Sequence, residues 1–96
     1  MQLPKMNAFV HIFVESSQMD AVVAALQKIS NIDEIFHVTG EFDLVTLVSA
    51  ENIEQFRDIL KNKIMKVNGI RSTVSSVVLH HHGRMETMPL ETLIPA

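Results

Sequence analysis

Residues 35–49 read IFHVTGEFDLVTLVS, and this stretch predicts the centre of the fold. Its two ends, residues 35–39 and 44–49, are short runs of apolar and β-branched side chains of the kind found in β-strands. Between them, residues 40–43 include a glycine and an aspartate, which are typical of a tight connection between paired strands. We therefore predict a β-hairpin at this point of the chain.

The residues before the hairpin predict one strand followed by one helix. Residues 8–14 (AFVHIFV) are rich in β-branched and aromatic side chains and are short enough to form a single strand. Ser16 and Ser17 are candidate N-caps, with Asp20 placed as in a capping box. Apolar residues then recur at steps of three and four, which predicts an amphipathic helix of about 12 residues. The apolar positions are Met19, Val22, Val23, Leu26 and Ile29.

The residues after the hairpin repeat this order, with a helix and then a strand. Asn52 is a candidate N-cap, and Asn68-Gly69 is a typical helix end. Residues 70–79 then predict a long last strand. The apolar positions of the predicted helix are Ile53, Phe56, Leu60, Ile64 and Val67.

The predicted order is strand, helix, strand, strand, helix, strand, which belongs to the α+β class. It fits the ferredoxin-like βαββαβ arrangement, a four-stranded antiparallel sheet with both helices on one face. The 96 residues suffice for one domain, and no composition shift marks a linker, so residues 1–96 are predicted to form a single domain.

Composition and charge argue against several classes of protein. The net charge is −3 and the eight lysines and arginines are scattered, which is unlike a nucleic-acid-binding surface. Cysteine is absent, so disulfides, thiolate zinc sites and a cysteine nucleophile are excluded. The longest apolar run, residues 44–48, is interrupted by Thr46 and is far too short to span a membrane. Residues 1–7 do not resemble a signal peptide, and we expect a cytoplasmic protein.

The predicted strands are apolar on both faces of the sheet. Phe9 and Phe13 alternate with the other apolar residues of their strand, and Val45 and Leu47 do the same in the third strand. Two helices cover only one face. Covering about 400 Å² of the other is worth about 10 kcal/mol before the costs of association. We expect a homodimer with sheet packed against sheet.

Glycine meets polar side chains in two segments, residues 40–43 and 69–73. Asp43 is suited to accept hydrogen bonds from a ligand ammonium group, whereas N–H groups near Gly40 and the hydroxyls of Ser72 or Thr73 are suited to hold a carboxylate. Together these groups would bind an amino acid. Residue types alone favour the simpler interpretation that both glycines mark turns and that Asp43 caps its own hairpin.

Two segments resemble the ligand-sensing domain of the Lrp/AsnC transcription regulators. Residues 38–48 (VTGEFDLVTLV) resemble the family's V-x-G-x-(aromatic)-D-hydrophobic segment, and residues 67–75 (VNGIRSTVS) resemble its pGV-x-x-T-x-(S/T) stretch. One predicted helix separates the two, as in the family. The resemblance covers about residues 8–79, and the tail Met88-Pro89-Leu90 is similar to the family's usual end.

This resemblance implies a RAM (regulation of amino-acid metabolism) domain, which dimerises through its sheets. The dimers assemble into rings, often octamers, and bind an amino acid effector between dimers without any cofactor. Carried over by position, Gly40, Phe42 and Asp43 are implied to line the effector pocket, with Thr73 and Ser75 as neighbours.

Full-length members of this family carry an N-terminal helix-turn-helix domain, for which residues 1–7 leave no room. We therefore expect a stand-alone module that does not contact DNA or a membrane directly. It would modulate transcription indirectly, by mixed assembly with full-length Lrp/AsnC relatives or by binding a metabolite.

Two other functions remain open at this point. One is a small dimeric α+β-barrel enzyme, similar to a monooxygenase or isomerase, for which His11 or His37 beside Asp43 would be the candidate groups. The other is an ACT-type amino-acid regulatory module. No nucleophile–base spacing is visible, so no catalytic residue is assigned. No metal site is assigned either, because only His80 and His82 of the His80-His81-His82 triplet would face the same way.

Overall fold

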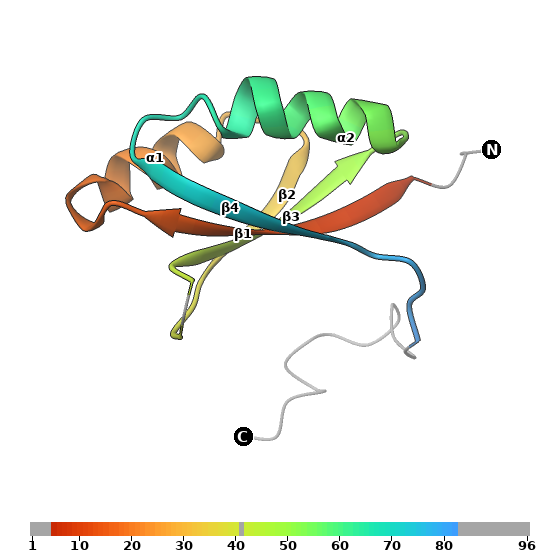
Figure 1. Ribbon diagram of the computed structural model, residues 1–96, viewed down its shortest axis with the longest axis horizontal. Helices are drawn as coiled ribbons and strands as arrows, with labels where there is room; N and C mark the ends of the chain where they lie inside the picture. The colour runs from red at the N-terminus through yellow and green to blue at the C-terminus, as the bar shows by residue number, and fades with distance from the viewer. Residues whose placement is uncertain (1–4, 41, 83–96) are drawn as a thin grey trace.

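The computed structural model describes residues 5–40 and 42–82, and these residues have the predicted βαββαβ order (Figure 1). Both helices lie on one face of a single antiparallel sheet, as expected for the ferredoxin-like fold. The expected tail at Met88-Pro89-Leu90 lies outside the described residues. The elements are β1 (Met6–Val14), α1 (Met19–Leu26), β2 (Ile32–His37), β3 (Leu44–Ala50), α2 (Ile53–Ile59) and β4 (Ile70–Val77).

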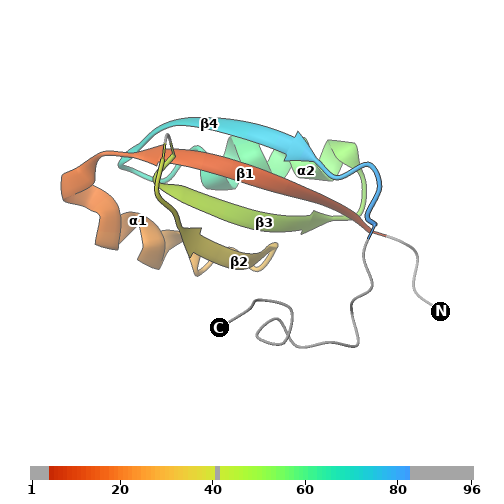
Figure 2. The same ribbon diagram turned by 90° about the horizontal axis from the view of Figure 1, so that it is seen from below.

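The strand order across the sheet is β2-β3-β1-β4, with every neighbouring pair antiparallel. β1 lies at the centre, where Val10 pairs with Thr46 of β3 on one side and Ser75 of β4 on the other. β2 and β4 form the two edges. Figure 2 shows the sheet from the side that no helix covers, which we call the open face.

The core lies between the sheet and the helices, and strict alternation along β1 and β3 builds it. Thr46 is the one polar residue among the fully buried side chains of the described part, and its hydroxyl donates to the Val10 carbonyl at 3.2 Å. The buried apolar residues are Ala8, Val10, Ile12, Val14, Val22, Leu26, Leu44, Val48, Ala50, Phe56, Ile59 and Ile64.

The two helix starts differ from each other in how well they were predicted. The predicted cap of α2 is confirmed, since the Asn52 side chain accepts a hydrogen bond from the Gln55 N–H at 2.8 Å. The predicted capping box of α1 is wrong. Ser16 and Ser17 lie in a 3-10 turn, Gln18 precedes the helix, and no side-chain capping bond forms there. The Gln18 N–H instead donates to the Glu15 carbonyl, so the backbone itself closes the first turn.

Several predicted boundaries also shift by a few residues. α1 has 8 residues rather than about 12. β2 begins at Ile32, earlier than the predicted residue 35, because Ile32 pairs with Val48 across an irregular step in the ladder. After α2 the chain continues through a π-helical turn, Leu60–Ile64, which completes the second predicted helix. In the described residues no helix is long and apolar enough to cross a membrane.

Candidate functional site

The connection between β2 and β3 projects from the open face, on the side of the sheet opposite the helices (Figures 1 and 2). Gly40 has φ +111°, a left-handed conformation that favours glycine, and an added Cβ would meet no atom within 4 Å. The predicted turn at Gly40 is therefore confirmed, and its backbone conformation is the reason for a glycine at this position. Of the predicted site residues, Gly40 and Phe42 lie in this connection, and Asp43 lies where it enters β3.

Asp43 links this connection to the end of β1 by hydrogen bonds. Its carboxylate oxygen Oδ2 accepts a hydrogen bond from the Val14 N–H at 2.7 Å, and its own N–H donates to the Ile12 carbonyl at 3.1 Å. The Asp43 carbonyl accepts from the Val38 N–H at 3.2 Å. Asp43 thus caps the neighbouring strand rather than its own hairpin. Among the described residues, Val14 is the only hydrogen-bond donor to this carboxylate, which leaves Oδ1 available to a ligand.

We predict that the Val14 hydrogen bond makes Asp43 a stabilising residue even without a ligand. Asp43→Ala leaves the partly buried Val14 N–H without its partner and is expected to lower the free energy of unfolding by about 1–3 kcal/mol. Asp43→Asn keeps an oxygen that can accept this bond and is expected to cost less than about 1 kcal/mol. Urea unfolding of both variants measures the difference. Equal losses of stability would contradict this function of the carboxylate oxygen.

Phe42 covers the open face beside Asp43. Its ring centroid lies 4.7 Å from that of His11 and 4.8 Å from that of Phe13, with both ring pairs tilted. His11 and Phe13 are residues of β1 that alternate with the buried core positions. An aromatic cluster of two strand residues and one loop residue therefore joins the connection to the sheet.

An open hollow of about 490 Å³ lies next to this cluster, lined by Phe13, Arg71 and Ser72. The register of β4 against β1 shifts between Phe13 and Val14, so that Val14 pairs with Ile70, Phe13 pairs with Ser72, and Arg71 is the extra residue. Nε of Arg71 lies 3.2 Å from a carboxylate oxygen of Glu15, and both side chains are largely exposed. The hollow combines a cation, a hydroxyl and an aromatic wall.

Sequence reasoning did not single out Arg71 or Phe13 for this site. Arg71 lies in the second Gly-containing segment. It is the one basic residue between Gly69 and Thr73, and this could have indicated a group that binds a carboxylate. The predicted alternation of Phe13 with the other apolar residues of its strand is confirmed. Its position beside Ser72 depends on the register of β4, which no local pattern specifies.

Thr73 and Ser75 lie on the other face of the sheet from Phe42. Thr73 pairs with Ile12 and Ser75 pairs with Val10, and paired residues of antiparallel strands point to the same side. Ile12 and Val10 are core residues under the helices. Within one copy, the structure brings Gly40, Phe42 and Asp43 together and does not bring Thr73 and Ser75 to them. A shared pocket from all five stays a prediction that needs a second subunit.

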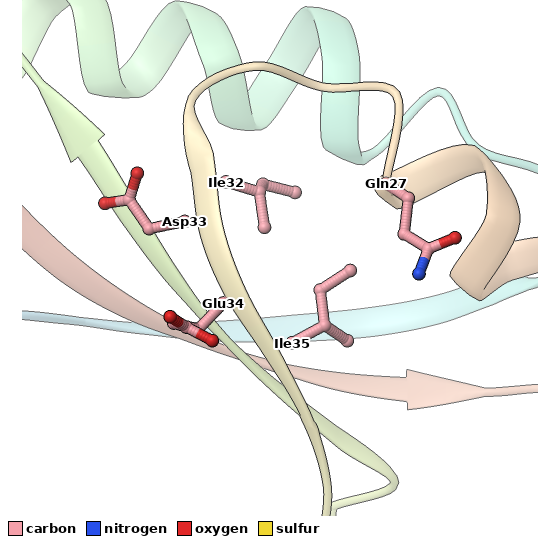
Figure 3. A pocket seen from close by; sticks show the side chains of 5 residues that line it. All are labelled: Gln27, Ile32, Asp33, Glu34 and Ile35. Carbon is pink, nitrogen blue, oxygen red and sulfur yellow. The ribbon is translucent and has the colours of Figure 1, made fainter. Parts of the chain in front are cut away.

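A second hollow of about 350 Å³ lies at the edge of the sheet along β2 (Figure 3). Gln27, which directly follows α1, and four consecutive residues of β2, including the carboxylates of Asp33 and Glu34, line it. Asp33 also accepts a hydrogen bond from the Ser49 hydroxyl. Among the described residues that line this hollow there is no histidine, hydroxyl or basic side chain, so they offer no nucleophile with a partnering base.

The His80-His81-His82 triplet lies at the end of the described residues. The rings of His80 and His82 lie 4.3 Å apart, and both side chains are exposed. Nowhere in residues 5–40 and 42–82 do three histidine, cysteine or carboxylate side chains gather in a way that could hold a metal ion.

Comparison with known proteins identifies the family of this chain. A family model described as the Lrp/AsnC ligand binding domain matches residues 7–88. The chain belongs to this family. The HTH-type transcriptional regulator FL11 of Pyrococcus horikoshii is 27% identical to it over 86 residues, which are 90% of this chain and 56% of that protein. The Lrp/AsnC chain thus spans about half the length of the curated relatives it matches.

Solved structures of similar fold support the assignment. A protein of Thermus thermophilus has a TM-score of 0.77 and 26% identity to this Lrp/AsnC domain, covering 82% of this chain and 99% of that chain. A feast or famine regulatory protein of M. tuberculosis, complexed with L-methionine, has a TM-score of 0.70 and 28% identity. The match covers 84% of this chain and 56% of that chain. FL11 of Pyrococcus horikoshii and the regulatory protein AsnC of Escherichia coli, which is 25% identical over 76 residues, are transcription regulators, a class of protein that is not enzymatic.

Proposed function

We propose that this Lrp/AsnC domain is an effector-sensing and oligomerisation module rather than an enzyme. It binds a small amino-acid-like ligand between dimers and modulates transcription indirectly, through its assembly with copies of itself or with full-length Lrp/AsnC relatives. Such an action on regulators implies a cytoplasmic location. The observation that carries the proposal is the position of the β2–β3 connection, which packs through Phe42 on His11 and Phe13 of the open face.

The open face supports self-association. Of the five phenylalanines, only Phe56 lies in the core under the helices, whereas the other four lie on or against the open face. Phe9 keeps 37% of its surface exposed, Phe36 45% and Val74 48%. An antiparallel sheet with one wet face normally carries polar residues there. A second copy packed on this face would remove these side chains from water.

The chemistry beside the connection suits a zwitterionic amino acid with an apolar side chain. Oδ1 of Asp43 is available for an ammonium group, and Arg71 and Ser72 supply donors for a carboxylate. Phe13 and Phe42 supply an apolar surface next to both. L-Methionine is the ligand of the M. tuberculosis relative and is therefore the first effector to test on this chain.

We expect methionine, or another apolar amino acid among the twenty, to raise the unfolding temperature of the purified protein. A ligand present at 100 times its Kd adds about 2.7 kcal/mol to the free energy of unfolding. Asp43→Asn is the informative variant, because it retains an acceptor for the Val14 N–H and removes the charge that would hold the ammonium group. Without ligand, we expect this variant to unfold within a few degrees of the wild-type protein, and with ligand we expect it to show no shift.

Two controls sharpen this thermal-shift measurement. N-acetyl-methionine, which lacks the ammonium group, should produce no shift with the wild-type protein. Asp33→Asn changes a carboxylate in the β2 hollow and should leave the shift intact. If none of the twenty amino acids stabilises the protein, the sensing part of the proposal is wrong. If Asp43→Asn responds like the wild type, the ligand binds elsewhere.

A further inference from the structure

The charged residues are distributed unevenly along the chain. With histidine counted as neutral, residues 15–43 hold six acidic residues and one lysine, which gives a net charge of −5. Residues 51–71 hold three acidic and five basic residues, which gives a net charge of +2. The charges of the remaining residues cancel. One part of the domain is therefore acidic and another part is basic, although the whole chain carries a charge of only −3.

The basic part lies in the helix layer, on the side of the sheet opposite the open face (Figure 1). Four of the eight lysines and arginines fall within residues 57–66, so the expectation that they are scattered is wrong for this segment. All four side chains are exposed, and none forms an ion pair with a described carboxylate. A sheet-to-sheet dimer leaves them in water. We call these residues the basic surface: Arg57 of α2, Lys61 and Lys63 of the π-helical turn, and Lys66 after it.

The backbone that carries the basic surface is held in place by hydrogen bonds and by the core. The Met65 N–H donates to the Leu60 carbonyl at 2.8 Å, and the Val67 N–H donates to the Ile64 carbonyl at 3.1 Å. Ile64 is also fully buried. Because this backbone is ordered before any partner binds, only the side chains lose freedom on docking, which lowers the entropic cost of a contact.

The hollow along β2 is the acidic counterpart of the basic surface. Its carboxylates, Asp33 and Glu34, are exposed and form no ion pair with a described basic side chain. Its volume of about 350 Å³ suffices for a lysine side chain, and the Gln27 amide oxygen is a further acceptor for an ammonium group.

The position of this hollow keeps it accessible in a sheet-to-sheet dimer. β2 is an edge strand, and Gln27 follows a helix of the covered side. Figure 3 shows Gln27 on the helix side of β2, so the hollow lies at the rim of the open face rather than at its centre. A neighbouring dimer can therefore reach it.

We propose that the β2 hollow of one copy receives the basic surface of a copy from another dimer. Two hollows cannot meet each other, because this would bring four carboxylates together without a cation. The contact therefore joins two different surfaces and links dimers head to tail, which builds a ring or a chain. This inference deepens the proposed function, on which it rests, since it names the surfaces through which dimers of the oligomerisation module meet.

Sedimentation velocity of the full chain, without any amino acid, at about 50 mM and about 500 mM NaCl tests this contact. Wild-type dimers should associate further at low salt. Because salt screens exposed ion pairs, the dissociation constant between dimers should rise at least about tenfold at high salt. Asp33→Lys with Glu34→Lys reverses the charge of the hollow, and Lys61→Glu with Lys63→Glu reverses that of the basic surface. Each of these double variants should remain a dimer at low salt.

Exchanging the charges separates the contact from damage to the fold. The two double variants, mixed in equal amounts, should associate further at low salt, because the reversed hollow of one meets the reversed basic surface of the other. A chain with all four substitutions should do so by itself. Glu34→Lys alone keeps the hydrogen bond between Asp33 and Ser49 and should weaken the wild-type association. Asp20→Lys changes an exposed carboxylate of α1 outside the hollow and should leave the association unchanged.

Three outcomes would overturn this contact. The first is a wild-type protein that has the mass of a dimer at both salt concentrations, and the second is an association that Glu34→Lys leaves unchanged. The third is a DNA duplex that binds the wild type but not Lys61→Glu with Lys63→Glu, while the dimers stay separate, since the basic surface would then serve nucleic acid. A single-subunit mass at high salt would instead refute the sheet-to-sheet dimer, and the charge exchange at low salt would still decide this contact.

Discussion

Phe9→Glu is expected to raise the dissociation constant of the proposed dimer at least about 100-fold, or about 2.7 kcal/mol. Phe9 lies on the open face in the central strand, where it pairs with Leu47 and Ser76. In a two-fold symmetric dimer the substitution places two carboxylates in one apolar interface. Burying an unpaired charge costs several kcal/mol, which is more than the loss of one aromatic contact.

Light scattering and sedimentation velocity at micromolar concentration measure the mass of the assembly, which falls when the dimer dissociates. Ala24→Glu adds the same charge to an exposed position of α1, away from the open face, and should leave the mass of the assembly unchanged. A single-subunit mass for the wild-type protein would refute the dimer altogether. An unchanged mass for Phe9→Glu would mean that the copies meet through another surface.

Gly69→Ala is expected to lower the free energy of unfolding by about 2–4 kcal/mol. Gly69 has φ +103°, and an added Cβ would lie 2.7 Å from Cβ of Gln18 and 2.8 Å from Cγ2 of Val22. Both distances are shorter than side-chain contacts allow. The Gln18 atom is held directly by the backbone, so the 3-10 turn and the start of α1 must move away from the start of β4.

Gly40→Ala is the matched control for this substitution. Gly40 has a similar φ of +111°, but no atom lies within 4 Å of an added Cβ, so only backbone strain of about 1 kcal/mol is expected. Urea unfolding of both variants gives the comparison. Equal losses would show that backbone strain dominates at both glycines and that the contact with α1 is unimportant.

The order of elements was predictable because each depends on neighbours in the chain. The alternation of β1 is visible in residues 8–14, and the Asn52 cap needs only Gln55, three residues later. The capping box of α1 shows the limit of such reasoning. Ser17 and Asp20 have the right spacing, yet the backbone bond from Gln18 to Glu15 forms a 3-10 turn there.

The candidate site was predictable only in part. Gly40, Phe42 and Asp43 are close in sequence, and the structure keeps them together at one end of β3. The hydrogen bond from Val14 to Asp43 joins residues 29 positions apart, and no local pattern indicates it. Thr73 and Ser75 were assigned to the same pocket, but their register against β1 puts them on the helix-covered face.

The sequence by itself determined the βαββαβ order, the family resemblance and the presence of apolar residues on both faces of the sheet, because period-two and helical patterns are local properties of the chain. Only the tertiary structure decided that Phe42 packs on His11, that Asp43 caps β1 and that Arg71 lies beside Phe13. These contacts depend on strand register, and a shift of one residue would move every side chain of a strand to the opposite face.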